Sequence, residues 1–353
     1  DSNNLVVNVV KTNLLGDLAG PFNPSNDDDA LLHPDTGNTF FGRKDDRLTK
    51  AYAGFGEVTW AATDKLSFIG GARYFHETLD GAQLTTHPFG GFGAAPEGVQ
   101  TNHDTFSKTT FKANASYKFG PQALLYATFS QGFRSGGLNP SNLPFASGIP
   151  RGFGPDSLDN IELGVKGRLA DGLFEYDTAA YRINWKDIQV RMIDETQAFT
   201  YTGNAGKAHV DGIEASLTGR FIDHLTMTLA GSYQSAVLDV GGSIPNVPKL
   251  QGTFSVDYTA PINSMFTGTL AADLSYRGDT HTRITETGNV DLASYTLLNL
   301  RAALNAGAWT TTFFVRNATD KRAEIDAISS TQDPLARITV RPRTYGVSVT
   351  RQF

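Results

Sequence analysis

The end of the chain alternates between two kinds of side chain. Tyr345, Val347, Val349 and Phe353 would fall on one face of an extended strand, and the other face carries small or polar residues. Successive side chains of a strand point to opposite faces, so the segment is apolar on one side only. A soluble sheet rarely leaves such a strand bare. A membrane barrel uses it, because lipid covers one face and a polar lumen the other.

The same alternation recurs along the chain, in segments of roughly ten to fifteen residues. The clearest cases are 107–119, 160–169, 224–234, 266–277 and 309–316. A tilted membrane strand needs about nine to eleven residues, whereas strands of soluble sheets most often have about five or six. Lys108, Lys112 and Lys118 share one face, which would be costly in lipid but acceptable in a wet lumen. Length and pattern therefore favour a transmembrane antiparallel β-barrel.

The connections between these segments alternate in length. Gly, Pro, Asn and Asp, which suit turns, mark tight connections at 62–65, 119–121, 170–172, 221–224, 260–263 and 305–308. Long connections are expected at 11–46, 78–105, 134–157, 186–205, 239–248, 278–292 and 320–338. This order predicts about fourteen antiparallel strands. By analogy with bacterial barrels, the tight turns and the carboxyl terminus should be periplasmic and the long loops extracellular.

Composition excludes several other classes of protein. The chain has 353 residues, 40% of them hydrophobic, and it contains no stretch of about eighteen apolar residues, so a helical membrane protein is excluded. It has no cysteine, which excludes a disulfide framework and thiolate metal ligands. A net charge of −6 gives no sign of nucleic-acid binding. We identify no linker that would divide residues 1–353 into separate domains.

Several segments, in a fixed order, carry a family resemblance. They are 125–137 (LYATFSQGFRSGG), 159–167 (DNIELGVKG), 181–190 (YRINWKDIQV), 204–214 (NAGKAHVDGIE), 315–321 (VRNATDK) and 342–346 (PRTYG) with the terminal Phe353. Each motif is weak alone, but together they resemble the β-barrel of TonB-dependent outer-membrane receptors across roughly residues 45–353. The resemblance implies a barrel of about 22 strands around an amino-terminal plug, of which this chain would be the carboxyl-terminal portion.

The resemblance also implies a function and partners. It predicts a protein of the bacterial outer membrane that imports a scarce ligand, foremost a ferric siderophore, with energy from the TonB complex reached through a segment outside this chain. Lipid, lipopolysaccharide and the barrel-assembly machinery would be further partners. The residues alone leave other classes open: a complete barrel of about fourteen strands acting as a passive porin or hydrophobic-solute channel, or a surface-exposed adhesion barrel.

Candidate site residues come from the expected loops and the closing strand. Aromatic and basic loop residues suit an anionic ligand at the barrel mouth, and they are His87, Phe89, Phe92, Arg134, Arg151 and Arg191. The closing strand is expected to carry the assembly signal, in Tyr345, Val347, Val349 and Phe353. Charged residues expected to line the lumen are Glu162, Lys166, Arg168, Glu214 and Arg220. We expect no catalytic residue, no metal site, no cofactor and no enzymatic activity.

Overall fold

The computed structural model describes seven stretches of the chain. They are residues 2–10, 39–87, 98–139, 148–194, 200–284, 289–328 and 336–352. Nearly all regular structure in them is β-strand, and the one helical element is a 3₁₀ turn, η4 (Ala170–Gly172). No helix in these stretches is long and apolar enough to cross a membrane.

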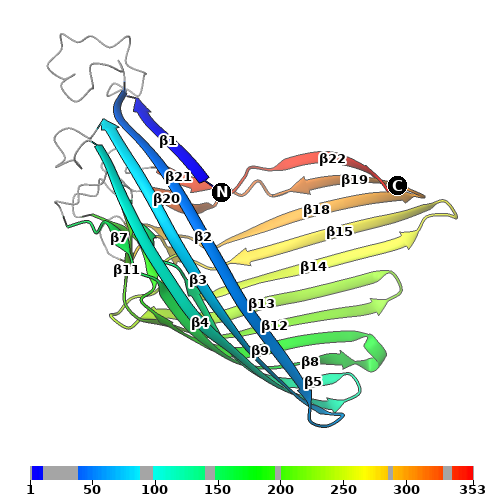
Figure 1. The fold of residues 1–353 in the computed structure, drawn as a ribbon. Helices are drawn as coiled ribbons and strands as arrows, with labels where there is room; N and C mark the ends of the chain where they lie inside the picture. Colours follow the sequence, from blue (N-terminus) through cyan, green and yellow to red (C-terminus); the bar gives the residue numbers. More distant parts are fainter. Residues whose placement is uncertain are drawn as a thin grey trace.

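A single antiparallel sheet of 14 strands forms the body of the molecule. Figure 1 shows it curving around an open trough, with the amino-terminal strands of the sheet on one side and its carboxyl-terminal strands on the other. In order across the sheet the strands are β1 (Ser2–Val10), β2 (Thr39–Ala61), β3 (Leu66–His87), β4 (Gly98–Gly120), β5 (Ala123–Arg134), β8 (Asp156–Leu169), β9 (Phe174–Lys186), β12 (Ala208–Ile222), β13 (Leu225–Leu238), β14 (Leu250–Pro261), β15 (Phe266–Arg277), β18 (Tyr295–Ala306), β19 (Trp309–Arg316) and β22 (Thr344–Arg351). Within the described residues, the edge strands β1 and β22 do not pair with each other.

The alternation of tight and long connections is confirmed. All six tight turns lie at one end of the sheet, here called the turn end, and the longer connections lie at the opposite loop end. Local chemistry explains two of the turns. The Thr63 hydroxyl accepts the backbone N–H of Leu66 at 2.9 Å, and the Asn263 side chain accepts that of Phe266 at 3.0 Å. These side chains satisfy backbone donors that a tight turn leaves unpaired.

The predicted bounds of two loops were wrong. The prediction placed loops at 11–46 and 78–105, but β2 begins at Thr39, and β3 and β4 continue to His87 and from Gly98. The β3–β4 ladder continues to the pair of Thr85 with Gly98. Backbone hydrogen bonds hold a ladder whatever side chains it carries, so a strand can continue after its apolar pattern has ended.

The loop end contains secondary structure that the alternation did not predict. Four two-stranded sheets form within the long connections. They pair β6 (Gly137–Leu138) with β7 (Gly152–Phe153), β10 (Gln189–Ile193) with β11 (Thr200–Asn204), β16 (Thr280–His281) with β17 (Asp291–Leu292), and β20 (Glu324–Ile328) with β21 (Ala336–Thr339). Figure 1 shows β7, β11, β20 and β21 gathered at this end. The long connections therefore contain regular secondary structure of their own.

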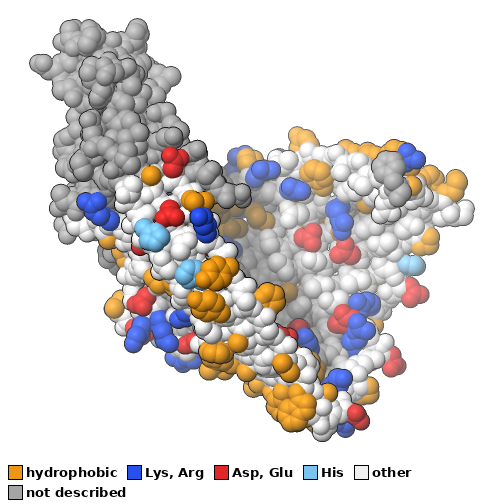
Figure 2. Space-filling view, viewed as in Figure 1, with side chains coloured by type: hydrophobic (Ala, Val, Ile, Leu, Met, Phe, Trp, Pro, Cys, Tyr) orange, Lys and Arg blue, Asp and Glu red, His pale blue; other side chains and the backbone are white. Residues whose placement is uncertain are grey.

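The two faces of the sheet differ in chemistry, as the alternation predicts. Leu163, Leu229 and Tyr233 on the outer face are all more than half exposed. The inner face carries ion pairs between neighbouring strands, and the trough wall in Figure 2 displays acidic and basic side chains. Glu175 accepts bonds from Arg168 at 2.9 Å and from Arg220 at 3.2 Å. Further inner-face pairs are Lys112–Glu57 at 3.1 Å and Arg301–Asp257 at 3.0 Å.

Compact packing occurs mainly where the loops meet the sheet. A cluster of buried side chains joins the second residue after β9 to the loop ends of β12 and β13, and its members are Ile188, Ala208, Val210, Ala236, Leu238 and Ile244. Ile188 is 2% exposed. Burial of these apolar surfaces fixes the connection that follows β9 on the sheet. The loop end thus has a support on which functional side chains can be held.

Candidate functional site

Arg134 is anchored to a buried carboxylate at the base of the β5–β8 connection. It is the last residue of β5 and lies opposite Asp156, the first residue of β8. Its Nε donates to the two Asp156 carboxylate oxygens at 3.1 and 2.9 Å, and its terminal nitrogen bonds the same carboxylate. The Asp156 side chain is 1% exposed. The guanidinium also lies over the Trp185 ring, 5.1 Å from its centroid. This ion pair gives Arg134 a structural role, and its predicted role in ligand binding stays a prediction.

Arg151 and Arg191 are exposed residues on two neighbouring loop segments. Arg151 immediately precedes β7, and Arg191 lies in β10 opposite Thr202 of β11. Contacts between β7 and β11 bring the two loop hairpins together. The structure therefore places these two predicted ligand contacts on adjoining segments at the loop end, and their role in binding stays a prediction.

The structure adds Asn139, which sequence reasoning missed. Asn139 is 2% exposed. Its side-chain amide donates to the carbonyls of Pro150 at 3.0 Å and Thr202 at 2.9 Å, and its oxygen accepts the Thr202 N–H at 2.8 Å. The NH₂ group and the oxygen of this buried side-chain amide therefore all have hydrogen-bond partners. The only sequence signal was its place next to the 125–137 motif, which gave no reason to expect contact with Thr202, 63 positions away.

Gln189 and Asn204 make similar connections. The Asn204 amide accepts the Gly154 N–H at 2.7 Å and donates to the Gly154 carbonyl at 3.1 Å. The Gln189 amide donates to the carbonyls of Ser135 and Gly154, both at 2.9 Å. Side-chain amides can replace the backbone partners that irregular segments lack. The β5–β8 and β9–β12 connections are therefore joined at several points.

The aromatic part of the predicted site lies outside the described residues. Phe89 and Phe92 lie outside the described residues. His87 is the last residue of β3, and its side chain also lies outside the described set. Their ligand-binding role stays a prediction.

A buried cation, Arg283, lies in the β15–β18 connection. Arg283 is 4% exposed. Burial lowers the pKa of its guanidinium, the positive charge of Arg191 lowers it further, and Asp326 acts in the opposite direction. Since Coulomb effects of this kind need proximity, three loops contribute charge to one region of the loop end. No motif in the sequence singled out this arginine.

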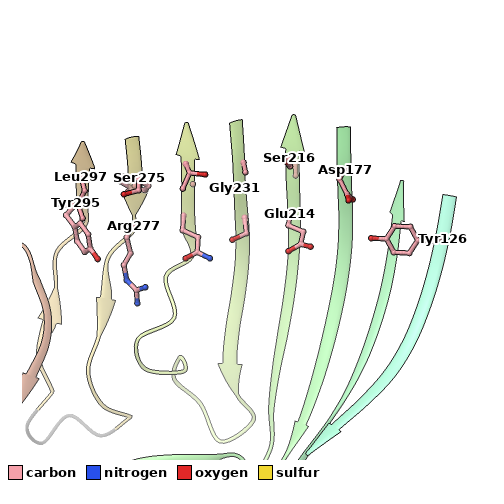
Figure 3. Close-up of a pocket in the computed structure, with 16 residues that line it drawn as sticks. Tyr126, Asp177, Glu214, Ser216, Gly231, Ser275, Arg277, Tyr295 and Leu297 are labelled. Carbon is pink, nitrogen blue, oxygen red and sulfur yellow. The ribbon is translucent and has the colours of Figure 1, made fainter. Parts of the chain in front are cut away.

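A polar groove runs along the inner wall. It encloses about 630 Å³ and crosses strands from β5 to β18. Figure 3 shows Tyr126, Asp177 and Glu214 toward one end and Arg277 and Tyr295 toward the other. Serine, threonine and glutamine fill the floor between them, in Ser216, Ser232, Gln251, Thr253 and Ser275. The wall can therefore hydrogen-bond a polar group, with carboxylates at one end and a guanidinium at the other.

Asn317 explains the 315–321 motif. It is 4% exposed, and its backbone φ of 50° is left-handed. Its amide donates to the carbonyls of Lys321 at 2.9 Å and Arg341 at 3.0 Å, and its oxygen accepts the Lys321 N–H at 2.9 Å. Asparagine tolerates a left-handed conformation better than most residues. The motif therefore joins the end of β19 to the residues that precede β22.

Three of the four residues predicted to carry the assembly signal are exposed on the closing strand. Tyr345, Val347 and Val349 are 76%, 58% and 60% exposed on β22, whereas Phe353 lies outside the described residues.

Two histidines on β3 and β4 make hydrogen bonds to side chains of the neighbouring strand. His76 bonds the Ser107 hydroxyl at 2.8 Å, and His103 bonds the Asp80 carboxylate at 2.6 Å. In the described part of the chain, no group of three or more His, Cys, Asp or Glu residues gathers to hold a metal ion.

Comparison with known proteins gives one consistent result. The family model described as "TonB dependent receptor-like, beta-barrel" matches residues 3–318. The rhizobactin receptor of Rhizobium meliloti (strain 1021) is 25% identical over 339 residues, which cover 85% of this chain and 43% of that protein. A pesticin receptor of Yersinia enterocolitica is 25% identical over 214 residues, covering 58% of this chain and 30% of that protein.

Solved structures agree on the fold. The ferric yersiniabactin uptake receptor FyuA from Yersinia pestis superposes with a TM-score of 0.72 at 17% identity, covering 90% of this chain and 48% of that one. The copper transporter OprC superposes with a TM-score of 0.62 at 15% identity, covering 89% and 54%. The matched regions thus cover between 30% and 54% of the length of these proteins.

The match to the family model covers most of the chain, and the inner and outer faces of the sheet have the chemistry of an outer-membrane barrel. Family and fold are those of transport receptors. The chain belongs to the TonB-dependent receptor family and is part of its outer-membrane β-barrel.

Proposed function

We propose that the protein containing this chain imports a ferric siderophore across the outer membrane, with energy supplied through TonB. One observation carries the proposal: the loop end holds Arg151 and Arg191 on adjoining segments that side-chain amides fix to each other. Guanidinium groups suit the carboxylate and phenolate oxygens of anionic chelates. The names of relatives, which include a rhizobactin receptor and a ferric yersiniabactin uptake receptor, support the same ligand class.

In this proposal each part of the chain has a task. The long loops face the cell exterior and capture the ferric complex, while the polar inner wall borders the path that it follows. The outer face contacts lipid and lipopolysaccharide, and β22 with Phe353 carries the signal for the barrel-assembly machinery. The TonB complex acts through a segment outside this chain. The chain catalyses no reaction of its own and acts as a receptor.

The test uses the full-length receptor in cells that lack other iron receptors. Uptake of radiolabelled iron is measured from trihydroxamate, tricatecholate and citrate complexes, with and without TonB. We expect uptake of at least one complex to stop without TonB while its binding to the cells persists. Uptake that continues without TonB would instead identify a passive channel, and absence of binding by all three complexes would exclude these siderophore classes.

A further inference from the structure

Side chains take part in every hydrogen bond that the described residues make between the β5–β8 and β9–β12 connections. Among the described residues, six hydrogen bonds run between the two connections, and two more join Gln189 to Arg134 and Asp156 at the adjoining ends of β5 and β8. Each of the eight pairs a side-chain group with a backbone group. No β-ladder links β7 with β11. The relative position of the two connections therefore depends on a small number of side chains, which single substitutions can remove.

Asn139 occupies a special place among these side chains. Its amide exchanges a pair of hydrogen bonds with Thr202, donating to the carbonyl at 2.9 Å and accepting the N–H at 2.8 Å. This is the exchange that opposite residues make in a hydrogen-bonded pair of an antiparallel ladder. The side chain thus replaces a strand that is missing between the two hairpins.

The same residue is tied to both arginine-bearing segments. Its backbone N–H donates to the Arg151 carbonyl at 2.9 Å. Thr202, its partner on the other side, is directly opposite Arg191 in the β10–β11 register. A continuous chain of contacts therefore runs from Arg151 through Asn139 and Thr202 to Arg191.

We propose that Asn139 is a positioning residue that fixes the spacing between the Arg151 and Arg191 segments, so that both guanidinium groups meet a single anionic ferric chelate. This inference rests on the proposed function. Holding the two segments in place before binding removes the cost of ordering them when the ligand arrives. Two arginines at a set separation also select among anions by the spacing of their carboxylate or phenolate oxygens.

The surrounding contacts allow Asn139 to be tested without loss of the fold. The Arg134–Asp156 ion pair and the bonds of Gln189 and Asn204 still hold the base of the two connections when the Asn139 amide is removed. Asn139→Ala should therefore loosen the contact between the outer parts of the β5–β8 and β9–β12 connections, while the barrel inserts normally. Asn263→Ala is the matched control, because it removes two amide-to-backbone bonds in a tight turn at the opposite end.

Pulsed electron paramagnetic resonance measures the spacing directly. Spin labels on Arg151→Cys and Arg191→Cys are introduced into the full-length receptor, and this chain contributes no cysteine of its own. We expect a narrow distance distribution that Asn139→Ala broadens and Asn263→Ala leaves unchanged. These labelled proteins serve for distance alone. An unchanged distribution in Asn139→Ala would overturn the proposal, whether or not a ligand is found.

Affinity is then measured in the unlabelled receptor with the trihydroxamate, tricatecholate and citrate complexes of iron. Asn139→Ala should weaken binding of the recognised complex by about tenfold, with unchanged heat resistance of the barrel and no change in Asn263→Ala. A broadened distance with unchanged affinity would overturn the positioning role and leave the proposed function intact. If the wild type binds none of the complexes, the proposed function fails, and the distance measurement still decides whether Asn139 sets the spacing.

Discussion

The strongest test of the barrel places the same charge on two consecutive residues of β13. Leu229 is 58% exposed on the outer face, between Leu217 of β12 and Phe254 of β14. Thr228 points to the inner face, where its hydroxyl bonds that of Thr218 at 3.1 Å. Leu229→Arg and Thr228→Arg thus add the same side chain to one strand at almost the same depth, and only the face differs.

The expected costs follow from that difference. Leu229 is four residues beyond Leu225, where β13 begins at the turn end, which at ~3.4 Å per residue and ~40° of tilt places it about 10 Å into the apolar band. That band is about 25 Å tall, so Leu229 lies near its middle, where an arginine costs about 2–4 kcal/mol. Thr228→Arg loses one hydroxyl pair, about 1 kcal/mol, and its charge enters a polar lumen.

Urea unfolding of the full-length receptor in lipid vesicles gives both free energies. Leu229→Ala serves as the control, because it removes the leucine contacts without adding a charge. We expect Leu229→Arg to destabilise the barrel clearly more than either of the other two variants. Equal costs for Leu229→Arg and Thr228→Arg would refute the assignment of faces, and with it the argument from alternation.

Two further predictions concern single contacts, and a third concerns the topology. Asn317→Ala leaves buried backbone groups without hydrogen-bond partners and should lower the free energy of unfolding by about 2–4 kcal/mol in the same assay. Asn317→Gly should lower it by about 1 kcal/mol less, because glycine adopts the φ of 50° without strain. Hydrogen bonds from the Arg343 backbone N–H and, next, from the Arg322 guanidinium lower the pKa of Asp320. The ionised carboxylate therefore stabilises the folded protein fully at neutral pH, and this stabilisation is lost as the pH falls through the lowered pKa. Asp320→Asn should make the free energy of unfolding less dependent on pH in this acidic range. Trypsin added to intact cells should cut after Arg151 and spare Lys65 in the turn at 62–65, and the reverse pattern would invert the topology.

The sequence predicted the sheet well because its signal is local. A residue in a two-faced strand must be apolar or polar according to its parity, so Leu163, Leu229 and Glu162 could be assigned to faces from the chain alone. Turn chemistry was equally readable, because the bonds of Thr63 and Asn263 join residues two or three positions apart. The number of strands and the alternation of connections followed from these two signals.

The loop end could not be predicted in the same way, because its contacts join residues that are far apart in sequence. Asn139 and Thr202 are separated by 63 positions, and Arg134 and Gln189 by 55. No periodic pattern encodes such pairs. The extension of β3 to His87 was missed for a related reason, since the ladder continues on backbone bonds after the apolar alternation has stopped.

Three asparagines at the loop end share one physical role. Asn139, Asn204 and Asn317 each use the side-chain amide both to donate to a backbone carbonyl and to accept a backbone N–H. An amide of this kind has the same donor and acceptor groups as a peptide unit, so it can replace a missing strand. Asp could accept but not donate, and Gln would place the amide one carbon farther away. Two of the three lie within motifs that resemble the family, and the third lies just after one. Those motifs therefore mark the points at which irregular loops must be fixed to a regular sheet, and a search for new loop-end contacts in this fold should begin with its asparagines.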